Sequence, residues 1–202
     1  MGLDLLLTQV RSCSLCQQHL PLGPRPVVQA SAQASVLIAG QAPGRKVHAS
    51  GKPFDDASGE RLRTWLGVKP ETFYDATKFA ILPMGFCYPG SGKGGDLPPR
   101  PECAPRWREP LLAQLPNIKL TLAIGRYAID WHLPEHHARV TDAVQSWQTH
   151  WPNLIALPHP SPRNNRWLAK NDWFERQLVP KIQARVASLL NENNELSLFS
   201  LD

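Results

Sequence analysis

The chain has 202 residues, of which 42% are hydrophobic, and its formal net charge is +5. This length supports one substantial core and is below the length at which cores divide, so we expect one domain over residues 1–190, followed by a polar, flexible tail over 191–202. There is no run of about 18 apolar residues and no basic segment with a cleavage site at the amino terminus, so we expect a cytoplasmic protein without a membrane span or a secretory signal.

Four short apolar runs predict buried strands, because none of them shows the polar alternation of a half-exposed strand. These runs are Val36–Ala39, Phe79–Leu82, Leu120–Ile124 and Leu154–Leu157. Helices are expected between and after the runs, at Gly59–Leu66, Ala104–Leu115, Ala128–Leu133, Thr141–His150 and Trp167–Asn191, the last of them bent at Pro180. The alternation predicts an α/β fold, a three-layer α/β/α sandwich with a central four-stranded parallel sheet.

Each predicted strand is followed by a distinctive loop, rich in glycine, proline or histidine. The loops are GQAPG at 40–44, PMGFCYPG at 83–90, GRYA at 125–128 and PHPSPRNN at 158–165. Ligands of such folds bind outside the carboxyl ends of the strands, where these loops should meet. The sequence therefore predicts that the loops form the functional site.

The four cysteines indicate a metal centre. Cys13 and Cys16 form a CxxC pair, and Cys87 and Cys103 lie far along the chain. In a reducing compartment this pattern favours metal binding over disulfides. Four thiolates suit tetrahedral zinc or a [4Fe–4S] cluster, and the spacing alone does not decide between them. Ordinary buried thiols are the alternative.

A resemblance to a known family becomes visible in the loops. The segment GQAPGRKVHASGKPF, residues 40–54, resembles the first motif of the family-four, iron–sulfur uracil-DNA glycosylases, GEAPG with a following PF, and it fits without a gap. His159-Pro160-Ser161 matches the second motif of that superfamily, and LTLAIGRYA resembles its third-strand segment. The likeness covers about residues 10–185. It implies a DNA glycosylase of base excision repair that hydrolyses the N-glycosidic bond of uracil or another damaged base.

The resemblance also implies roles for individual residues. Phe54 would stack on a base flipped out of the DNA, and His159 would donate a hydrogen bond to that base as negative charge develops on it. Other positions expected to contact the base are Gly40, Ala42, Pro43, Gly44 and Pro83. Positions expected to contact DNA are Ser161, Pro162, Arg163, Asn164 and Arg166. Cys13, Cys16, Cys87 and Cys103 would hold a [4Fe–4S] cluster, with zinc as the alternative.

The sequence departs from the family pattern where its polar groups are expected. Gln41 replaces the glutamate of GEAPG, and Ala42 stands where another branch has a catalytic aspartate. Pro83 replaces the asparagine that reads the uracil edge, so the base that this chain recognises is left open. Gln41 and His159 are therefore both catalytic candidates, but Gln41 lacks the carboxylate that usually orients water.

Two further side chains could take the place of the missing carboxylate. His48 could hold a water molecule, and so could Asp55 or its neighbour Asp56. Adjacent aspartates point in different directions, so at most one of the two would face the pocket. In the alternative, the segment DDASGERL only caps the following helix, through Asp56 or Ser58.

Partners follow from the charge and from the carboxyl terminus. The segment from Arg163 to Arg185 contains six basic residues and two acidic ones, which favours DNA as the partner. The protein itself is expected to be a monomer. Glu195–Phe199, ELSLF, resembles the short motif that binds the bacterial sliding clamp. Two other functions stay open, a non-catalytic protein that binds DNA damage with the same fold, and an enzyme of free nucleosides or nucleotides.

Overall fold

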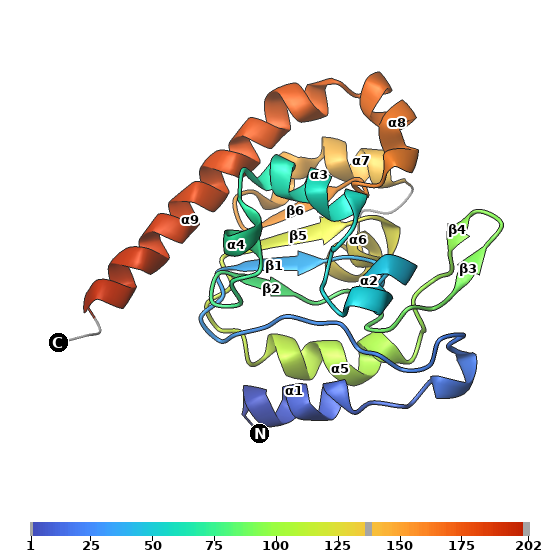
Figure 1. Ribbon diagram of the computed structural model, residues 1–202. Coiled ribbons are helices and arrows are strands. Elements are labelled where there is room, and N and C mark those ends of the chain that lie inside the picture. The colour runs from blue at the N-terminus through green and yellow to red at the C-terminus, as the bar shows by residue number, and fades with distance from the viewer. Residues whose placement is uncertain (1, 136–138, 200–202) are drawn as a thin grey trace.

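The structure is a computed structural model that describes residues 2–135 and 139–199, with side chains described as far as residue 192. Its centre is a sheet of four parallel strands in the order β2-β1-β5-β6 (Figure 1). The strands are β1 (Val36–Ala39), β2 (Phe79–Ile81), β5 (Leu120–Ile124) and β6 (Leu154–Leu157). Three of them have the predicted bounds and β2 is one residue shorter, so the α/β sandwich with a four-stranded parallel sheet is confirmed.

Helices cover both faces of the sheet (Figure 1). The helices α1 (Leu3–Arg11) and α5 (Cys103–Leu112) lie on one face, where Leu37 and Trp107 belong to the same core cluster. On the other face, α3 (Ala57–Leu66), α7 (Val140–Gln145) and α9 (Val179–Phe199) enclose a larger cluster. Because both faces are covered, the strands are apolar except for Thr121 in β5.

The remaining elements are short. They are the helices α2 (Arg45–Ser50), α4 (Pro70–Phe73), α6 (Arg126–His132) and α8 (Asn165–Lys170), the 3-10 turns Gln17–His19, Trp147–His150 and Pro162–Asn164, the π-helical turn Phe174–Leu178, and the hairpin of β3 (Ser91–Gly92) and β4 (Gly95–Asp96). The helix expected over Thr141–His150 is thus divided into α7 and a 3-10 turn. Within the described ranges, none of the helices combines the length and the apolar content that crossing a membrane requires.

The prediction of one continuous helix over Trp167–Asn191 is wrong. The chain leaves the helix after Lys170, and the Asn171 side chain donates a hydrogen bond to the Trp167 carbonyl at 2.9 Å. Pro180 is the second residue of α9 and follows directly on the π-helical turn Phe174–Leu178, so the helix is irregular just before the proline, and the bend expected at Pro180 stays a prediction. The helical backbone continues to Phe199, past the expected boundary at residue 191. Side chains from residue 193 onward lie outside the description, so the flexible tail stays a prediction.

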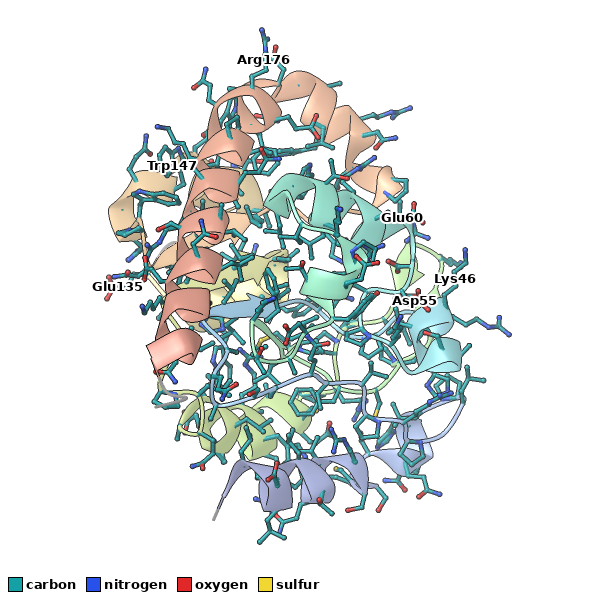
Figure 2. The ribbon with its side chains drawn as sticks, turned by 60° about the vertical axis from the view of Figure 1, so that its left-hand side comes forward. Lys46, Asp55, Glu60, Glu135, Trp147 and Arg176 are labelled. Carbon is teal, nitrogen blue, oxygen red and sulfur yellow. The ribbon has the colours of Figure 1, made fainter. Side chains whose placement is uncertain are left out.

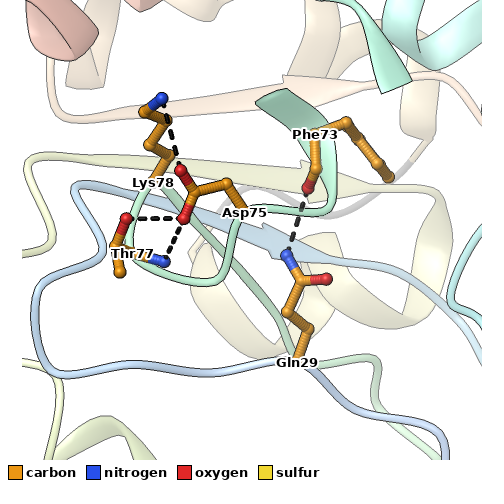
Figure 3. Close-up of polar contacts among 5 residues, drawn as sticks. All are labelled: Gln29, Phe73, Asp75, Thr77 and Lys78. Carbon is orange, nitrogen blue, oxygen red and sulfur yellow. Dashed lines mark hydrogen bonds and ion pairs between the residues drawn. The ribbon is translucent and has the colours of Figure 1, made fainter. Parts of the chain in front are cut away.

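A segment before β1 covers the outer edge of β2 and fixes that strand's position. Gln29 exchanges two backbone hydrogen bonds with Ile81, at 3.1 and 2.7 Å. Its side-chain amide donates to the carbonyls of Phe73 at 3.1 Å and Phe79 at 2.8 Å; Figure 3 shows the first of these contacts. Figure 3 also shows the turn that leads into β2, in which Asp75 accepts a bond from the Thr77 N–H at 3.0 Å and pairs with Lys78 at 3.2 Å.

A buried arginine fixes the carboxyl end of β2. Arg108, which is 0% exposed, donates to the carbonyls of Leu82 and Pro83 and contacts Nε2 of His132 at 2.7 Å. Because the guanidinium has only donors, the His132 ring accepts this hydrogen bond and is neutral. Burial and the positive charge of Arg108 lower the pKa of His132 to about 4. The contact thus holds the loop after β2 in place, provided that His132 does not gain a proton.

This contact predicts sensitivity to acid. An unfolded histidine has a pKa near 6.5, so between about pH 6.5 and pH 4 the unfolded chain binds a proton at position 132 that the folded chain excludes. Stability is then lost as the pH falls through that window, by at most about 1.4 kcal/mol per pH unit from this residue. We expect His132→Gln, which keeps an acceptor for Arg108, to flatten the dependence in urea unfolding from pH 4.5 to pH 7. The exposed His19→Gln is the control, and an unchanged slope in His132→Gln would contradict the prediction.

Candidate active site

A pocket of about 440 Å³ lies at the carboxyl edge of the sheet. It is lined by the loops that follow β1, β2 and β6, and by the hairpin of β3 and β4. From the first three loops come residues 40–44, Pro83 and His159, and from the hairpin Gly94, Gly95 and Asp96. The loop after β5 packs against His159, since a Cβ at Gly125 would lie 3.7 Å from the side chain of His159. The loops therefore meet as the sequence predicted.

Phe54 forms an aromatic wall of the pocket, and its backbone is unusual. Its φ is +53°, a left-handed conformation that a non-glycine residue rarely adopts. Its ring lies so close to Gly40 that a Cβ there would be 3.3 Å from Cζ of the ring, and a Cβ at Gly59 would collide with its carbonyl oxygen. The same oxygen accepts a hydrogen bond from Arg63 at 3.4 Å, and Phe73 packs edge-on against the ring at 6.3 Å between centroids. Two glycines and these contacts hold the ring in one position.

His159 presents a defined hydrogen-bond donor to the pocket. The Ser161 backbone N–H donates to its Nδ1 at 3.2 Å, so the neutral ring carries its proton on Nε2. Burial lowers the pKa of His159, while the charges of Asp56 and Asp96 act in the opposite direction without reversing the shift. The ring is therefore a neutral donor at pH 7.

The loop that carries His159 is held by side chains from three directions. Asn164 donates to the His159 carbonyl at 2.7 Å. Arg61 of α3 donates to the Ser161 carbonyl at 3.2 Å and to Oδ1 of Asn165 at 2.8 Å. Arg163 reaches across to the Gly94 carbonyl at 3.0 Å. Sequence reasoning missed Arg61, because a contact between residues about one hundred positions apart leaves no local pattern.

The predicted DNA-contacting residues divide into two groups. Ser161, Arg163 and Asn164 line the pocket. Pro162 and Arg166 are exposed and lie outside its lining, on the turn and helix that follow.

The candidates for the missing carboxylate lie in different places. His48 is buried in α2 outside the pocket lining, 6.1 Å from the ring of Tyr88, whereas its neighbour Val47 lines the pocket. Burial and the charge of Arg25 lower the pKa of His48. Asp55 is exposed at the surface (Figure 2). The structure thus places neither His48 nor Asp55 in the pocket.

Asp56 caps the following helix and also lines the pocket. Its Oδ1 accepts the Gly59 N–H at 2.9 Å and caps α3, which ends at Gly67 with a φ of +67°. Its Oδ2 faces the pocket, where a Cβ at Gly44 would lie 3.9 Å away. One of the two adjacent aspartates therefore faces the pocket, as the sequence suggested, and it is the second.

Gln41 and Asp96 connect the first loop to the hairpin. The side-chain amide of Gln41 donates to the Leu97 carbonyl at 3.0 Å, so it anchors the hairpin. Asp96, at the end of β4, brings a second carboxylate to the lining of the pocket. The glycine-rich segment SGKGGD signals a tight turn, but nothing local indicates that this turn folds over the pocket. Asp96 was therefore missed from the sequence.

The four cysteines come together around a second, smaller pocket, where Arg100 and Trp107 also lie. All four are free thiols, and the Phe86 N–H donates to Sγ of Cys103 at 3.3 Å. Burial raises the pKa of Cys87 to about 11 and that of Cys103 to about 12. Among the residues that the structure describes, no group of three or more His, Cys, Asp or Glu side chains converges on the position of a single metal ion.

The family follows from a comparison over most of the chain. Residues 27–183 match the family model described as the uracil DNA glycosylase superfamily. The matched region contains the whole sheet, the hairpin and every residue of the pocket lining. Cys13, Cys16 and the carboxyl-terminal residues lie outside it. On this evidence the chain belongs to the uracil DNA glycosylase superfamily.

Proposed function

We propose that this protein is a DNA glycosylase, which flips a damaged base into the pocket and hydrolyses its N-glycosidic bond. The observation that carries the proposal is that the Phe54 ring and His159, with its proton on Nε2, line one pocket of about 440 Å³. A flipped base needs an apolar face to stack on and polar groups at its edge. This pocket offers both at the loop-rich edge of the sheet.

The chemistry assigned to His159 follows from the charge that develops during cleavage. When the bond between the sugar and the base breaks, its electron pair stays on the base, and the oxygens of the base become more negative. A fixed N–H donor stabilises this charge more than it stabilises the bound substrate. A neutral imidazole suits the task, because Ser161 keeps the proton on the nitrogen that is free to face the base.

Pro83 bears on the choice of base. A proline side chain has no donor or acceptor, and the Pro83 carbonyl already accepts a hydrogen bond from Arg108 at 3.1 Å. We propose that the pocket reads uracil or another damaged base through the backbone of the Gly40–Gly44 loop and through its other polar side chains. The base itself is identified by the assay below.

Exposed cations near the pocket support DNA as the substrate. Arg166 follows the loop that carries His159. Lys46 extends outward from α2, and the next residue of that helix, Val47, lines the pocket (Figure 2). Side chains of this kind bind phosphates and position the duplex without reading its sequence.

We also propose that the four cysteines hold a [4Fe–4S] cluster that joins the amino-terminal segment to the loop after β2. The thiols surround one pocket and form no disulfide. Four thiolates suit either tetrahedral zinc or a [4Fe–4S] cluster. The likeness of Cys13, Cys16, Cys87 and Cys103 to the cluster ligands of the iron–sulfur branch favours the cluster over zinc. Burial raises the pKa of Cys87 and Cys103, so both are neutral thiols when no cation is bound beside them.

The central prediction concerns His159. On duplex and single-stranded oligonucleotides that carry uracil, hypoxanthine, xanthine or an oxidised base, we expect the wild type to release at least one base. His159→Ala should slow single-turnover cleavage about 10²- to 10³-fold, the cost of removing one such donor. DNA affinity should change little, because the donor acts mainly in the transition state.

The control is His150→Ala, since His150 lies before β6, at the opposite edge of the sheet from the pocket. This variant should cleave at the wild-type rate. Failure of the wild type to release any base, together with tight and salt-sensitive DNA binding, would instead establish the non-catalytic DNA-binding function.

A second prediction tests the metal centre. Protein purified without oxygen should contain about four iron atoms and four sulfides per chain and absorb visible light, as thiolate-bound clusters do. Cys87→Ser should lose most of the iron and lower the melting temperature, whereas Ser14→Ala, within the CxxC loop, should keep both. One zinc per chain would contradict the cluster but keep the four-thiolate site, and a metal-free protein would contradict both.

The clamp-binding motif at Glu195–Phe199 also stays a proposal, because its side chains lie outside the described residues. Two apolar anchors in such a motif should supply most of the binding energy. We therefore expect a double Leu198→Ala, Phe199→Ala variant to lose affinity for the bacterial sliding clamp about 10-fold or more in surface plasmon resonance, while Asn191→Ala keeps it. Equal binding by all three proteins would refute this role.

A further inference from the structure

The pocket has an acidic side chain that the loop after β1 does not supply. Gln41 cannot accept a proton as a carboxylate does, and its amide is occupied by the Leu97 carbonyl. Ala42, next to it, has no polar group. Of the side chains that line the pocket, two are carboxylates, those of Asp56 and Asp96.

These two carboxylates differ in what they are free to do. Oδ1 of Asp56 caps α3, so changing Asp56 would disturb the helix that also holds Phe54 through Gly59. Asp96 lies on the exposed hairpin, and its Oδ1 accepts a hydrogen bond from the Ser91 hydroxyl at 2.9 Å. Ser91 is in turn bonded to the Tyr88 hydroxyl at 2.7 Å. Asp96 is thus oriented by a short chain of hydroxyl groups, and no helix depends on it.

The second oxygen of Asp96 is directed toward the first-strand loop. A Cβ at Gly44 would lie 3.2 Å from Oδ2 of Asp96, so the carboxylate occupies space that any larger residue would crowd. Gly44 belongs to the GQAPG loop, in which the family otherwise carries its acidic residue. The negative charge of Asp96 also acts on His159, since it opposes the lowering of the His159 pKa. Asp96 and the donor for the leaving base therefore belong to one electrostatic site.

Three contacts hold the hairpin over the pocket. The Leu97 N–H donates to the Gly90 carbonyl at 2.8 Å and closes the base of the hairpin. Gln41 holds the Leu97 carbonyl, and Arg163 holds the carbonyl of Gly94 at the turn. Gln41 stands where the family pattern has a glutamate, and its side chain holds the hairpin in place. That hairpin carries Asp96, so the residue that replaces one carboxylate positions another.

We propose that Asp96 is a catalytic residue of this glycosylase and replaces, from the β3–β4 hairpin, the carboxylate that the first-strand loop lacks. The proposal rests on the proposed function. In the hydrolysis, the water oxygen forms a bond to C1′ of the sugar as the bond from C1′ to the base nitrogen breaks. The electron pair of that bond goes to the base, which His159 stabilises. Asp96 orients the water and accepts its proton, which then passes to solvent, and the base takes up a proton from solvent.

The test compares the rate of cleavage with the affinity for DNA. Asp96→Asn keeps the shape and an oxygen that can accept the Ser91 hydrogen bond, but it removes the charge and the proton acceptor. We expect its single-turnover rate to fall about 10²-fold or more on the base that the wild type releases, the typical contribution of a general base. The dissociation constant for the same oligonucleotide and the melting temperature should stay close to those of the wild type.

Two further variants refine the result. Ser91→Ala, which frees the carboxylate to rotate, should show a smaller loss of rate in the same direction, because Ser91 only positions Asp96. Glu60→Gln is the matched control for lost charge, since Glu60 is an exposed acid on the first turn of α3, outside the pocket lining, and should cleave normally (Figure 2).

Each result bears on the proposal separately from the proposed function. If the wild type and Asp96→Asn cleave at equal rates, the glycosylase activity stands and the role of Asp96 is refuted. A fall in rate matched by an equal loss of affinity or of melting temperature would also refute it, because Asp96 would then be structural. If the wild type releases no base, the proposed function fails and the role of Asp96 fails with it.

Discussion

The hydrogen bond from the Ser161 N–H to Nδ1 of His159 determines what the pocket can do chemically. It assigns the proton to Nε2 and so turns an ambiguous imidazole into a donor of known direction. The bond exists only because the loop after β6 turns back on itself between His159 and Asn164, and Asn164 and Arg61 hold that turn. The sheet contributes by ending its strands where this loop meets Phe54 and the GQAPG segment. The fold serves mainly to keep one donor and one aromatic ring at fixed positions.

Glycine plays a corresponding role around Phe54, the aromatic wall of the pocket. Phe54 adopts a backbone conformation that is costly for a side chain of its size. The surroundings impose it, because Gly40 makes room for the ring and Gly59 makes room for the carbonyl group. Strain of this kind persists only where neighbouring contacts hold it in place, and here they do so at the ring expected to stack on the base. The position of Phe54 is thus more constrained than its half-buried surface suggests.

Much of the fold could be predicted from the sequence, because its signals are local. A buried parallel strand is an unbroken apolar run, as at Val36–Ala39, and the loops that follow such runs meet at one edge of the sheet. The break after Lys170 could not be predicted, since the apolar residues continue across it and the polar contact that ends the helix depends on Asn171. Just before Pro180 the helix contains the π-helical turn Phe174–Leu178, and no local pattern in the sequence indicated that turn.

The residues of the site could be predicted where a local motif carries them, and not where a distant segment brings them in. Phe54, His159 and the GQAPG loop lie where their motifs indicated. His48 does not, because residues 45–50 form a helix, in which neighbouring side chains point about 100° apart, so Val47 faces the pocket and His48 does not. Asp96 lies more than fifty residues from Gly44 and reaches it only through the folded hairpin. Only the three-dimensional structure could reveal the carboxylate on the hairpin.

The central claim is that this pocket breaks the bond between a base and its sugar. Its most direct test is to incubate the wild-type protein with DNA that carries each damaged base and to search for the free base by mass spectrometry and for the abasic site left in the strand. The proposed function predicts both products, in equal amounts, for at least one of the bases. DNA that is bound tightly but recovered intact in every case would contradict it.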